Sequence, residues 1–489
     1  MKTAIIALSI ALVFPVTSVA QDLTALSASE AAAKIRKSEI TSEAIAKALI
    51  DKAKAGKSLN AFITLDEAGA LKAARAADAG GKAKKWKGSL HGVPLVIKDN
   101  IHVAGLPSTA GTPGMKDFVP TEHAPVVKKL VAAGAVVLGK TNMHELAFGI
   151  TSNNAAFGAV GNPYDPKRIA GGSSGGNGAA IAARLAPAGL GTDTGGSVRI
   201  PSAVNGVSGL RPTIGRYPQQ GITPLSHTRD TAGPMARSVA DLVLLDSVIT
   251  DAKDAVVPAE LKGLRIGVPK SLNEGVEAET DRLMTATLAK LKAAGVELVE
   301  ADIPNLMELN NKLSFPILLY EVTIDLPAYA KNHGIKLDLK GYADKAAGPD
   351  VKGVFGALVK GEPPSIPRNV YEEAIKVHRP ALVKAYADYF SQNKVVAMVF
   401  PTVPLPAAPM GDDQETMLDG KKVPTVGTFM RNTDPGSNAG VPGLTVPMGM
   451  TKDGLPVGLE LDGPRGTDRK LLAIGLALEN LVGPIPPPK

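Results

Sequence analysis

Gly171-Gly-Ser-Ser-Gly-Gly-Asn-Gly-Ala-Ala180 and Gly191-Thr-Asp-Thr-Gly-Gly-Ser-Val-Arg199 are two glycine-rich stretches that share one feature: in each, a serine follows a pair of glycines. These serines, Ser173 and Ser197, lie 24 residues apart. One such stretch alone is typical of a loop that leads into a helix. Two of them indicate a shared site, because glycine allows backbone N–H groups to turn inward and leaves room for another molecule to approach.

The glycine-rich stretches lie in a chain where predicted strands alternate with predicted helices. Residues 93–97 form a continuous apolar run, which is typical of a strand buried on both faces. A helix is predicted at 124–133, and a second buried strand follows Gly134 at 135–138. This alternation predicts an α/β fold with one mixed central β-sheet covered by helices on both faces. Length alone would favour roughly three domains.

Apolar periodicity predicts further elements along the rest of the chain. Residues 338–367 form the loosest segment, and we expect an excursion there, near a substrate entrance. Between 157 and 215, where glycine and small residues dominate, the predicted elements are helices, at about 177–185 and after Ser197. Elsewhere, strands are expected at 61–65, 264–268, 296–300, 395–400, 444–448 and 457–459, and helices at 236–249, 280–294, 304–312, 370–390 and 468–481.

Composition excludes several classes of function. Of the 489 residues, 44% are hydrophobic, which is ample for a large buried core. The formal net charge of +7 is small for a chain of this length and its lysines are scattered, so we expect no nucleic-acid partner. Cysteine is absent, which excludes disulfides, a cysteine nucleophile and cysteine-ligated zinc.

The first 20 residues have the pattern of a secretory signal peptide. The basic Lys2 precedes an apolar run at 4–14, and Ser18 and Ala20 are small residues at the positions that a signal peptidase reads. The run is too short to span about 30 Å of hydrocarbon. We therefore expect cleavage after Ala20, a periplasmic or secreted location, and a mature domain at 21–489 with no membrane attachment.

Other motifs do not fit their context. Residues 134–141 match the phosphate-loop pattern, but a predicted helix precedes them and their middle residues are themselves predicted to be a strand. Residues 171–175 match the nucleophile elbow of α/β-hydrolases, yet a turn-rich loop precedes them, so an esterase is only an alternative. The seven histidines form no zinc-binding pair, and no metal site is expected. His102 stays open as a base, because it lies close to Lys98 in sequence.

Three separated pieces of the chain together resemble the amidase signature family. Residues 92–100 look like the family's lysine strand, and the two glycine-rich stretches look like the signature itself. Residues 202–212 and 230–235 continue the similarity, which covers about 25 to 480 and is weakest between about 305 and 430. The resemblance implies a single large α/β domain, the amidase signature fold, in place of the three domains that length suggests.

The resemblance also implies a role for each site residue. Ser197 would be the nucleophile, Ser173 the bridging serine after a cis peptide bond, and Lys98 the base. Asp193 and Arg199 would hold the loop, and the family's reaction needs no metal and no cofactor. Inward-turned N–H groups would form an oxyanion hole, and the candidates are those of Thr194, Gly195, Gly196 and Ser197.

The residues themselves are compatible with this chemistry. A serine hydroxyl is a poor nucleophile until a base removes its proton. A lysine can be that base when burial or a nearby cation lowers its pKa, and Lys98 at the end of an apolar strand could be so buried. From its position alone, a surface lysine just past a strand is the alternative. Strand alternation points the neighbouring Asp99 to the opposite face.

We therefore expect an exported hydrolase that cleaves a small amide to a carboxylate and ammonia or an amine through a Ser197 acyl-enzyme. Residues 177–216 and 229–231 look like the mandelamide and indoleacetamide hydrolases of the family, which implies an aryl or arylalkyl carboxamide. The alternatives are a carbamate or ester hydrolase of the urethanase type, a peptide amidase, and a non-catalytic binding protein. The sequence leaves the oligomeric state open, a homodimer included.

Five apolar residues would either line a pocket or form helix core: Leu313, Phe315, Leu318, Leu319 and Tyr320.

The cleavage site gives a first prediction. If the leader is removed, the N-terminal residue of the exported protein is Gln21 or lies within a residue or two of it, because Ser18 and Ala20 mark the site. N-terminal sequencing of protein collected from the periplasm or the medium measures this. An intact Met1 on exported protein would contradict it.

Overall fold

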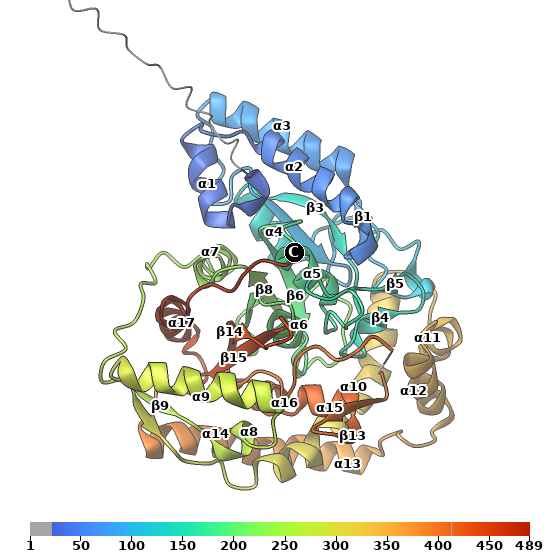
Figure 1. Cartoon of the computed structure of the whole chain (residues 1–489). Helices are drawn as coiled ribbons and strands as arrows, with labels where there is room; N and C mark the ends of the chain where they lie inside the picture. The colour runs from blue at the N-terminus through green and yellow to red at the C-terminus, as the bar shows by residue number, and fades with distance from the viewer. Residues whose placement is uncertain (1–21, 412) are drawn as a thin grey trace, which may run out of the picture.

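Strand β2 (Pro94–Lys98) is the third strand from one edge of an eleven-stranded mixed sheet in the computed structural model, which describes residues 22–411 and 413–489 (Figure 1). β2 runs parallel to both of its neighbours, β3 and β6, whereas β6 is antiparallel to β8. The predicted α/β fold with a mixed central sheet is confirmed. In spatial order the strands are β1 (Phe62–Leu65), β3 (Val136–Thr141), β2, β6 (Ala188–Asp193), β8 (Thr231–Ala236), β7 (Ser208–Arg211), β14 (Gly443–Met450), β15 (Pro456–Asp462), β11 (Ala397–Pro401), β9 (Arg265–Gly267) and β10 (Glu297–Val299).

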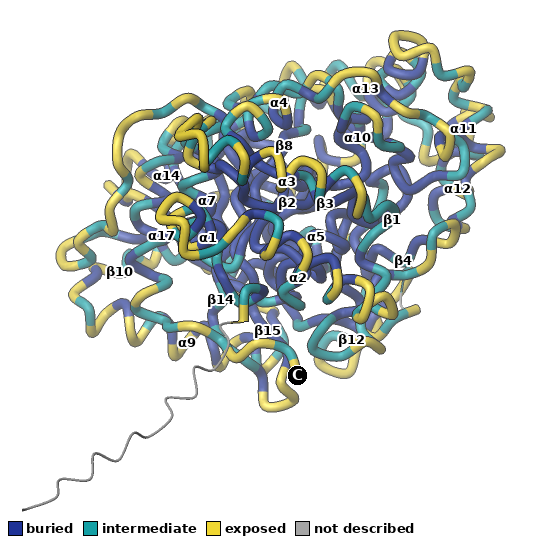
Figure 2. The backbone as a smooth tube through the Cα atoms, turned by 90° about the horizontal axis from the view of Figure 1, so that it is seen from above, coloured by how far each residue is buried: buried dark blue, intermediate teal, exposed yellow. Residues whose placement is uncertain are grey.

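Helices cover both faces of this sheet, because the strand residues alternate between two apolar layers. Leu95 and Ile97 of β2 pack in one cluster with α4, α7, α9 and α17, whereas Val96 packs in another with α1, α2 and α3. Figure 2 shows the resulting buried core beneath a more exposed outer layer. These helices are α1 (Ala28–Arg36), α2 (Ser42–Ala55), α3 (Glu67–Lys82), α4 (Pro125–Ala132), α7 (Val239–Thr250), α9 (Ala278–Ala293) and α17 (Asp468–Val482).

The remaining elements lie around the sheet and between its strands. Two short hairpins add β4 (Asn153–Asn154) with β5 (Gly158–Ala159), and β12 (Glu415–Leu418) with β13 (Lys421–Pro424). The other helices are α5 (Gly175–Ala182), α6 (Arg199–Val204), α8 (Lys270–Asn273), α10 (Leu306–Asn332), α11 (Leu339–Lys345), α12 (Pro349–Lys360), α13 (Arg368–Glu373), a π-helical turn (Ala374–His378), α14 (Arg379–Asn393), α15 (Thr425–Met430) and α16 (Asp434–Ala439).

Three central strands, β6, β7 and β8, were not predicted from the sequence. They contain glycine where buried strands usually carry branched side chains, because neighbouring groups approach them very closely. A Cβ atom added at Gly189 would lie 2.6 Å from Val96 Cγ2 and 2.7 Å from the Val96 carbonyl oxygen. A Cβ at Gly191 would lie 2.8 Å from Ser174 Oγ. Glycine in these strands therefore reflects tight packing and not a loop.

The segment 304–367 is more helical than predicted. The helix expected at 304–312 continues through Pro316 and Pro327 to Asn332, since α10 packs its buried side chains into two apolar clusters. The expected excursion at 338–367 forms α11 and α12. The Glu145 carboxylate accepts hydrogen bonds from the N–H groups just before α12, at 3.0 Å from Ala347 and 2.7 Å from Gly348. This partner lies about two hundred residues away in sequence, so no local pattern reveals it.

The structure confirms the context of the phosphate-loop match. Helix α4 precedes Gly134, and residues 136–141 of the match belong to β3. The leader predicted at residues 1–20 lies outside the described residues. Within residues 22–411 and 413–489, the helices lack the combination of length and apolar character that crossing a membrane requires.

The close packing at Gly189 gives a second prediction. Gly189→Ala should destabilise the protein by about 1–3 kcal/mol, because the new methyl group overpacks β2. Gly353→Ala is the matched control, since a Cβ there meets nothing within 4 Å and the residue lies inside helix α12. Urea unfolding of the two purified variants compares them. A Gly189→Ala protein as stable as the Gly353→Ala protein would contradict the packing argument.

Candidate active site

Lys98, the last residue of β2, is fully buried. Its Nζ lies 2.7 Å from Ser173 Oγ and 2.8 Å from Thr192 Oγ1. Burial lowers the pKa of Lys98 to about 7, and the more distant charges of Asp193 and Asp230 offset this only in part. The lysine is therefore a buried group and not a surface residue, and near neutral pH a large share of it can carry a free amine lone pair.

The two glycine-rich stretches meet at this lysine. Ser173 follows a cis peptide bond after Gly172 and precedes helix α5, and Ser197 precedes helix α6. The stretches are joined directly, because the Ser174 N–H donates to the Ser197 carbonyl oxygen at 3.2 Å. The structure thus brings together all three predicted catalytic candidates, Lys98, Ser173 and Ser197, from three separate parts of the chain.

The backbone N–H groups of residues 194–197 differ in their availability. The Gly196 N–H already donates to Asp193 Oδ1 at 2.9 Å, which departs from the expectation that it faces a substrate oxygen. Among the hydrogen bonds of the described residues, the N–H groups of Thr194, Gly195 and Ser197 have no acceptor. Three of the four expected oxyanion donors therefore have no acceptor among the described residues.

Asp193 is held by two buried arginines, one of them predicted. Arg199 Nε donates to Asp193 Oδ2 at 3.0 Å, and Arg211 Nη1 donates to Asp193 Oδ1 at 2.9 Å. Burial alone would raise the pKa of Asp193, but the two guanidinium groups outweigh it and hold the pKa well below its usual range. The carboxylate stays charged and also accepts from the Val198 N–H at 3.1 Å. It thereby fixes the turn that carries Ser197.

Thr192 and Asn100 are site residues that the sequence did not single out. The Thr192 hydroxyl accepts from Lys98, and Asn100 Nδ2 lies 3.2 Å from the same oxygen. Asn100 lies two residues after Lys98, and Thr192 directly precedes Asp193. Their polar side chains next to two predicted site residues were the signal that could have identified them. Asp99 behaves as strand alternation predicts: its carboxylate turns away from Ser173 and accepts from the Thr109 N–H at 2.8 Å.

An apolar cavity opens beside Ser197. Its wall includes Phe148, Ile150, Leu225, Phe315, Leu318 and Met430. Two of the five apolar residues singled out in the sequence, Phe315 and Leu318, therefore contribute to the pocket. Of the others, Leu313 and Leu319 are buried in the core, and the Tyr320 ring stacks on Tyr371 at 4.1 Å between centroids.

The hydrogen-bond partner of the His102 imidazole is a tyrosine and not one of the two site serines. Its Nε2 lies 2.6 Å from the hydroxyl oxygen of Tyr329, a residue of helix α10. Burial lowers the pKa of His102 to about 3. The imidazole is therefore neutral at physiological pH and already has a partner.

Comparison with known proteins agrees with this geometry. The profile of the family described as Amidase matches residues 44–472. An indoleacetamide hydrolase of Agrobacterium vitis is 42% identical over 469 residues, which cover 96% of this chain and 97% of that protein. A mandelamide hydrolase of Pseudomonas putida is 40% identical over 484 residues, covering 96% and 94%. A crystal structure of an amidase superposes with a TM-score of 0.83 at 34% identity, covering 94% of this chain and 100% of the other.

The matched region contains every site residue described above, and the relatives align along almost the whole chain. The protein accordingly belongs to the amidase family and is a hydrolase acting on C–N bonds.

Proposed function

We propose that the protein hydrolyses a primary amide of a small aryl or arylalkyl carboxylic acid through an acyl-enzyme on Ser197. The observation that carries the proposal is the buried Lys98–Ser173 contact beside Ser197, under an apolar cavity. The names of the two relatives, an indoleacetamide hydrolase and a mandelamide hydrolase, support the same class of substrate.

In the proposed reaction the neutral Lys98 amine takes the Ser173 proton while Ser173 takes the Ser197 proton. Ser197 Oγ attacks the amide carbon, and the N–H groups of Thr194, Gly195 and Ser197 stabilise the resulting oxyanion. Ser173 returns a proton to the amide nitrogen, the C–N bond breaks, and ammonia leaves. Water then attacks the acyl carbon and gives one proton to the same relay. The relay passes this proton to Ser197 Oγ as the bond between Ser197 and the acyl group breaks, and the carboxylic acid is released. Each of these steps uses side chains or backbone N–H groups of the protein together with water.

The cavity supports a neutral, apolar acyl group. Arg229 is a charged residue of its wall, but its guanidinium is engaged by Asp434 and by the Ser314 carbonyl oxygen at 2.9 Å. It is therefore poorly placed to bind a substrate carboxylate. A flat ring would be held by Phe315 and Leu318 of α10 and by the other apolar side chains of the wall.

We also propose that the enzyme is exported, on the evidence of the basic, apolar and small-residue pattern of residues 1–20. A substrate that reaches the periplasm or the medium is then required, and small uncharged aryl amides meet that requirement. Sequencing of the mature N-terminus, described above, tests this proposal.

The Lys98 environment predicts the pH profile. Activity needs the neutral amine, so kcat should rise with pH through about 7 and level off above it, because burial lowers the Lys98 pKa to that value. Lys98→Ala should lose most of the rate together with this limb. A folded Lys98→Ala protein with an unchanged profile would assign the base to another group.

The substrate class is tested by comparing kcat/KM for phenylacetamide or mandelamide with that for a C-terminal peptide amide and an aryl carbamate. We expect the aryl amide to be preferred by more than about tenfold, equivalent to roughly 1.4 kcal/mol of transition-state binding. A tenfold preference for the peptide amide or the carbamate would indicate a peptide amidase or a urethanase.

The role of Ser197 is tested by its substitution. Ser197→Ala should lower turnover by about 10⁴-fold and abolish labelling by a fluorophosphonate, because the acyl-enzyme can no longer form.

A further inference from the structure

Residues 225–230, called the pocket loop below, connect the cavity to helix α10. On the inner side, Leu225 and Arg229 line the cavity. Asp230 accepts from the Thr194 hydroxyl at 2.6 Å, and Thr194 also supplies one of the free N–H groups beside Ser197. A displacement of the pocket loop would therefore move the cavity wall and the glycine-rich turn together.

On the outer side, two carboxylates of α10 hold the same loop. Glu321 Oε2 accepts from the Ser226 hydroxyl at 2.5 Å and from the Thr228 hydroxyl at 3.0 Å. Asp325 Oδ2 accepts from the His227 N–H at 2.8 Å. Because α10 also carries Phe315 and Leu318, these bonds join two walls of one cavity.

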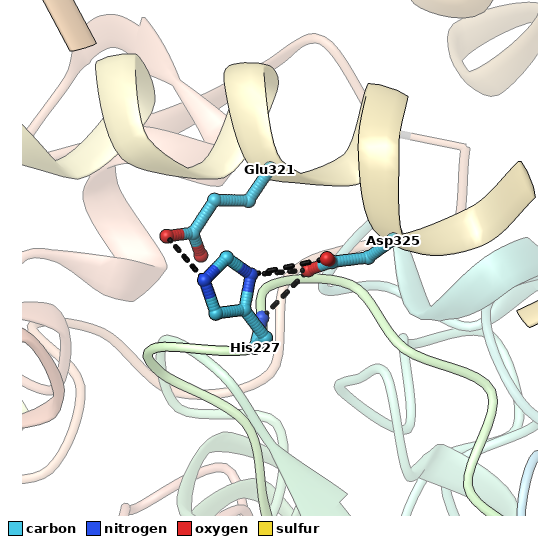
Figure 3. A group of neighbouring side chains, drawn as sticks. All are labelled: His227, Glu321 and Asp325. Carbon is cyan, nitrogen blue, oxygen red and sulfur yellow. Dashed lines mark hydrogen bonds and ion pairs between the residues drawn. The ribbon is translucent and has the colours of Figure 1, made fainter. Parts of the chain in front are cut away.

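The His227 imidazole lies between the two carboxylates (Figure 3). Its Nδ1 is 2.9 Å from Asp325 Oδ2, and its Nε2 is 3.6 Å from Glu321 Oε1. The imidazole is half-exposed, Asp325 is mostly buried and Glu321 is fully buried. An imidazolium can donate toward both carboxylates, whereas a neutral imidazole that keeps its bond to Asp325 turns a lone pair toward Glu321.

The same three residues have the separations of a metal site, with ligand atoms within 4.8 Å of one another. The orientation of the ring favours an ion pair, because each of its nitrogens already faces a carboxylate (Figure 3). Glu321 is also saturated by hydroxyl donors, including Tyr371 at 3.0 Å. A cation would have to displace these bonds.

We propose that His227 is a positioning residue for amide hydrolysis: its imidazolium, held between Glu321 and Asp325, fastens the pocket loop to α10 and so keeps the acyl cavity closed around the substrate. The inference rests on the proposed function, since it concerns the pocket assigned there to the acyl group. Loss of the proton loosens the pocket loop and weakens substrate binding, while the buried contact between Lys98 and Ser173, and with it the titration of Lys98, is unchanged.

The charges around the imidazole set the direction of this pH effect. The bond to Asp325, together with the charges of Glu321, Asp325 and Asp230, raises the pKa of His227 above 6.5 and outweighs its partial burial. The His227 imidazolium therefore holds the pocket loop to α10 fully below about pH 6.5. This stabilisation is lost as the pH rises through the raised pKa of His227. The ionisable groups facing the imidazole and its partners are Glu321 and Asp325 of α10, Asp230 and Arg229 of the pocket loop, Tyr371 of α13, and Arg379 of α14, whose Nη2 donates to the Thr228 carbonyl oxygen at 2.6 Å.

The test measures KM and kcat for an aryl amide across pH for the wild type and two His227 variants. In the wild type, KM should rise about threefold to fivefold above the imidazole titration, a small factor because one partner of the ion pair is half-exposed. His227→Gln should show the high KM at every pH. His227→Arg, which carries a fixed charge, should retain the low KM at every pH. The kcat limb set by Lys98 should be the same in all three proteins.

Lys312→Gln is the matched control, because it removes a cation from another ion pair of α10, that with Glu308 at 2.6 Å. Its KM profile should follow the wild type. A wild-type KM that is independent of pH, or a pH dependence that persists in His227→Gln, would overturn the proposal. So would a KM that is lowered by added Zn²⁺ and raised by EDTA, which would assign the three residues to a metal.

An NMR titration of the histidine side chains separates this proposal from the proposed function, because it needs no substrate. The His227 signal, identified by its loss in His227→Gln, should titrate above 6.5 in the full-length protein, and Asp325→Asn should lower its midpoint. A midpoint at or below 6.5 overturns the positioning role whatever the enzyme hydrolyses. A midpoint above it, in an enzyme that turns over no aryl amide, supports the ion pair and refutes only the substrate class.

Discussion

Burial of the Lys98 amine without an acidic hydrogen-bonding partner is the constraint on which the site depends. A buried ammonium is costly unless it is paired, and the hydrogen-bond partners of Lys98 in the described structure are the hydroxyls of Ser173 and Thr192. The amine is therefore poised between its charged and neutral forms. The rest of the architecture preserves this state: the residue ends a strand covered on both faces, and the neighbouring strand β6 packs closely against that strand at Gly189.

A second buried lysine shows that burial alone does not define the role. Lys140 of β3 is as buried as Lys98, but its Nζ lies 3.6 Å from the Asp99 carboxylate and donates to Ser108 Oγ at 2.8 Å and to the Pro107 carbonyl oxygen at 3.1 Å. Burial lowers the pKa of Lys140 to about 8, and Asp99 works against that shift. Lys140 ties down the loop that follows Lys98. The two lysines differ in their partners, because Lys98 has two hydroxyls whereas Lys140 has a carboxylate and a carbonyl oxygen besides the Ser108 hydroxyl.

Much of the fold and of the site could be predicted from the sequence, and the failures have physical causes. Residues 93–97 and 135–138 were predicted as strands because their apolar side chains mark them. Strand β6 was missed because its neighbours leave no room for such side chains. Ser173 and Ser197 were found through the glycine–serine stretches, and Lys98 was found through the family resemblance of residues 92–100. Thr192 and the His227 group were not, since their importance comes from partners far away in sequence: Lys98 for the threonine, and Glu321 and Asp325 for the histidine.

The apolar side of the cavity and the reacting groups belong to different parts of the architecture. Phe315 and Leu318 lie on α10 and Met430 on α15, whereas Lys98 ends a sheet strand and Ser197 follows another. Exchanges at Phe315 and Leu318 can alter the shape available to an acyl group without crowding the glycine-packed strands, because both side chains come from α10. During evolution, substitutions on this apolar side can therefore change which acyl groups are accepted. The strands that hold Lys98 and Ser197 keep their packing, and the reaction itself is inherited unchanged.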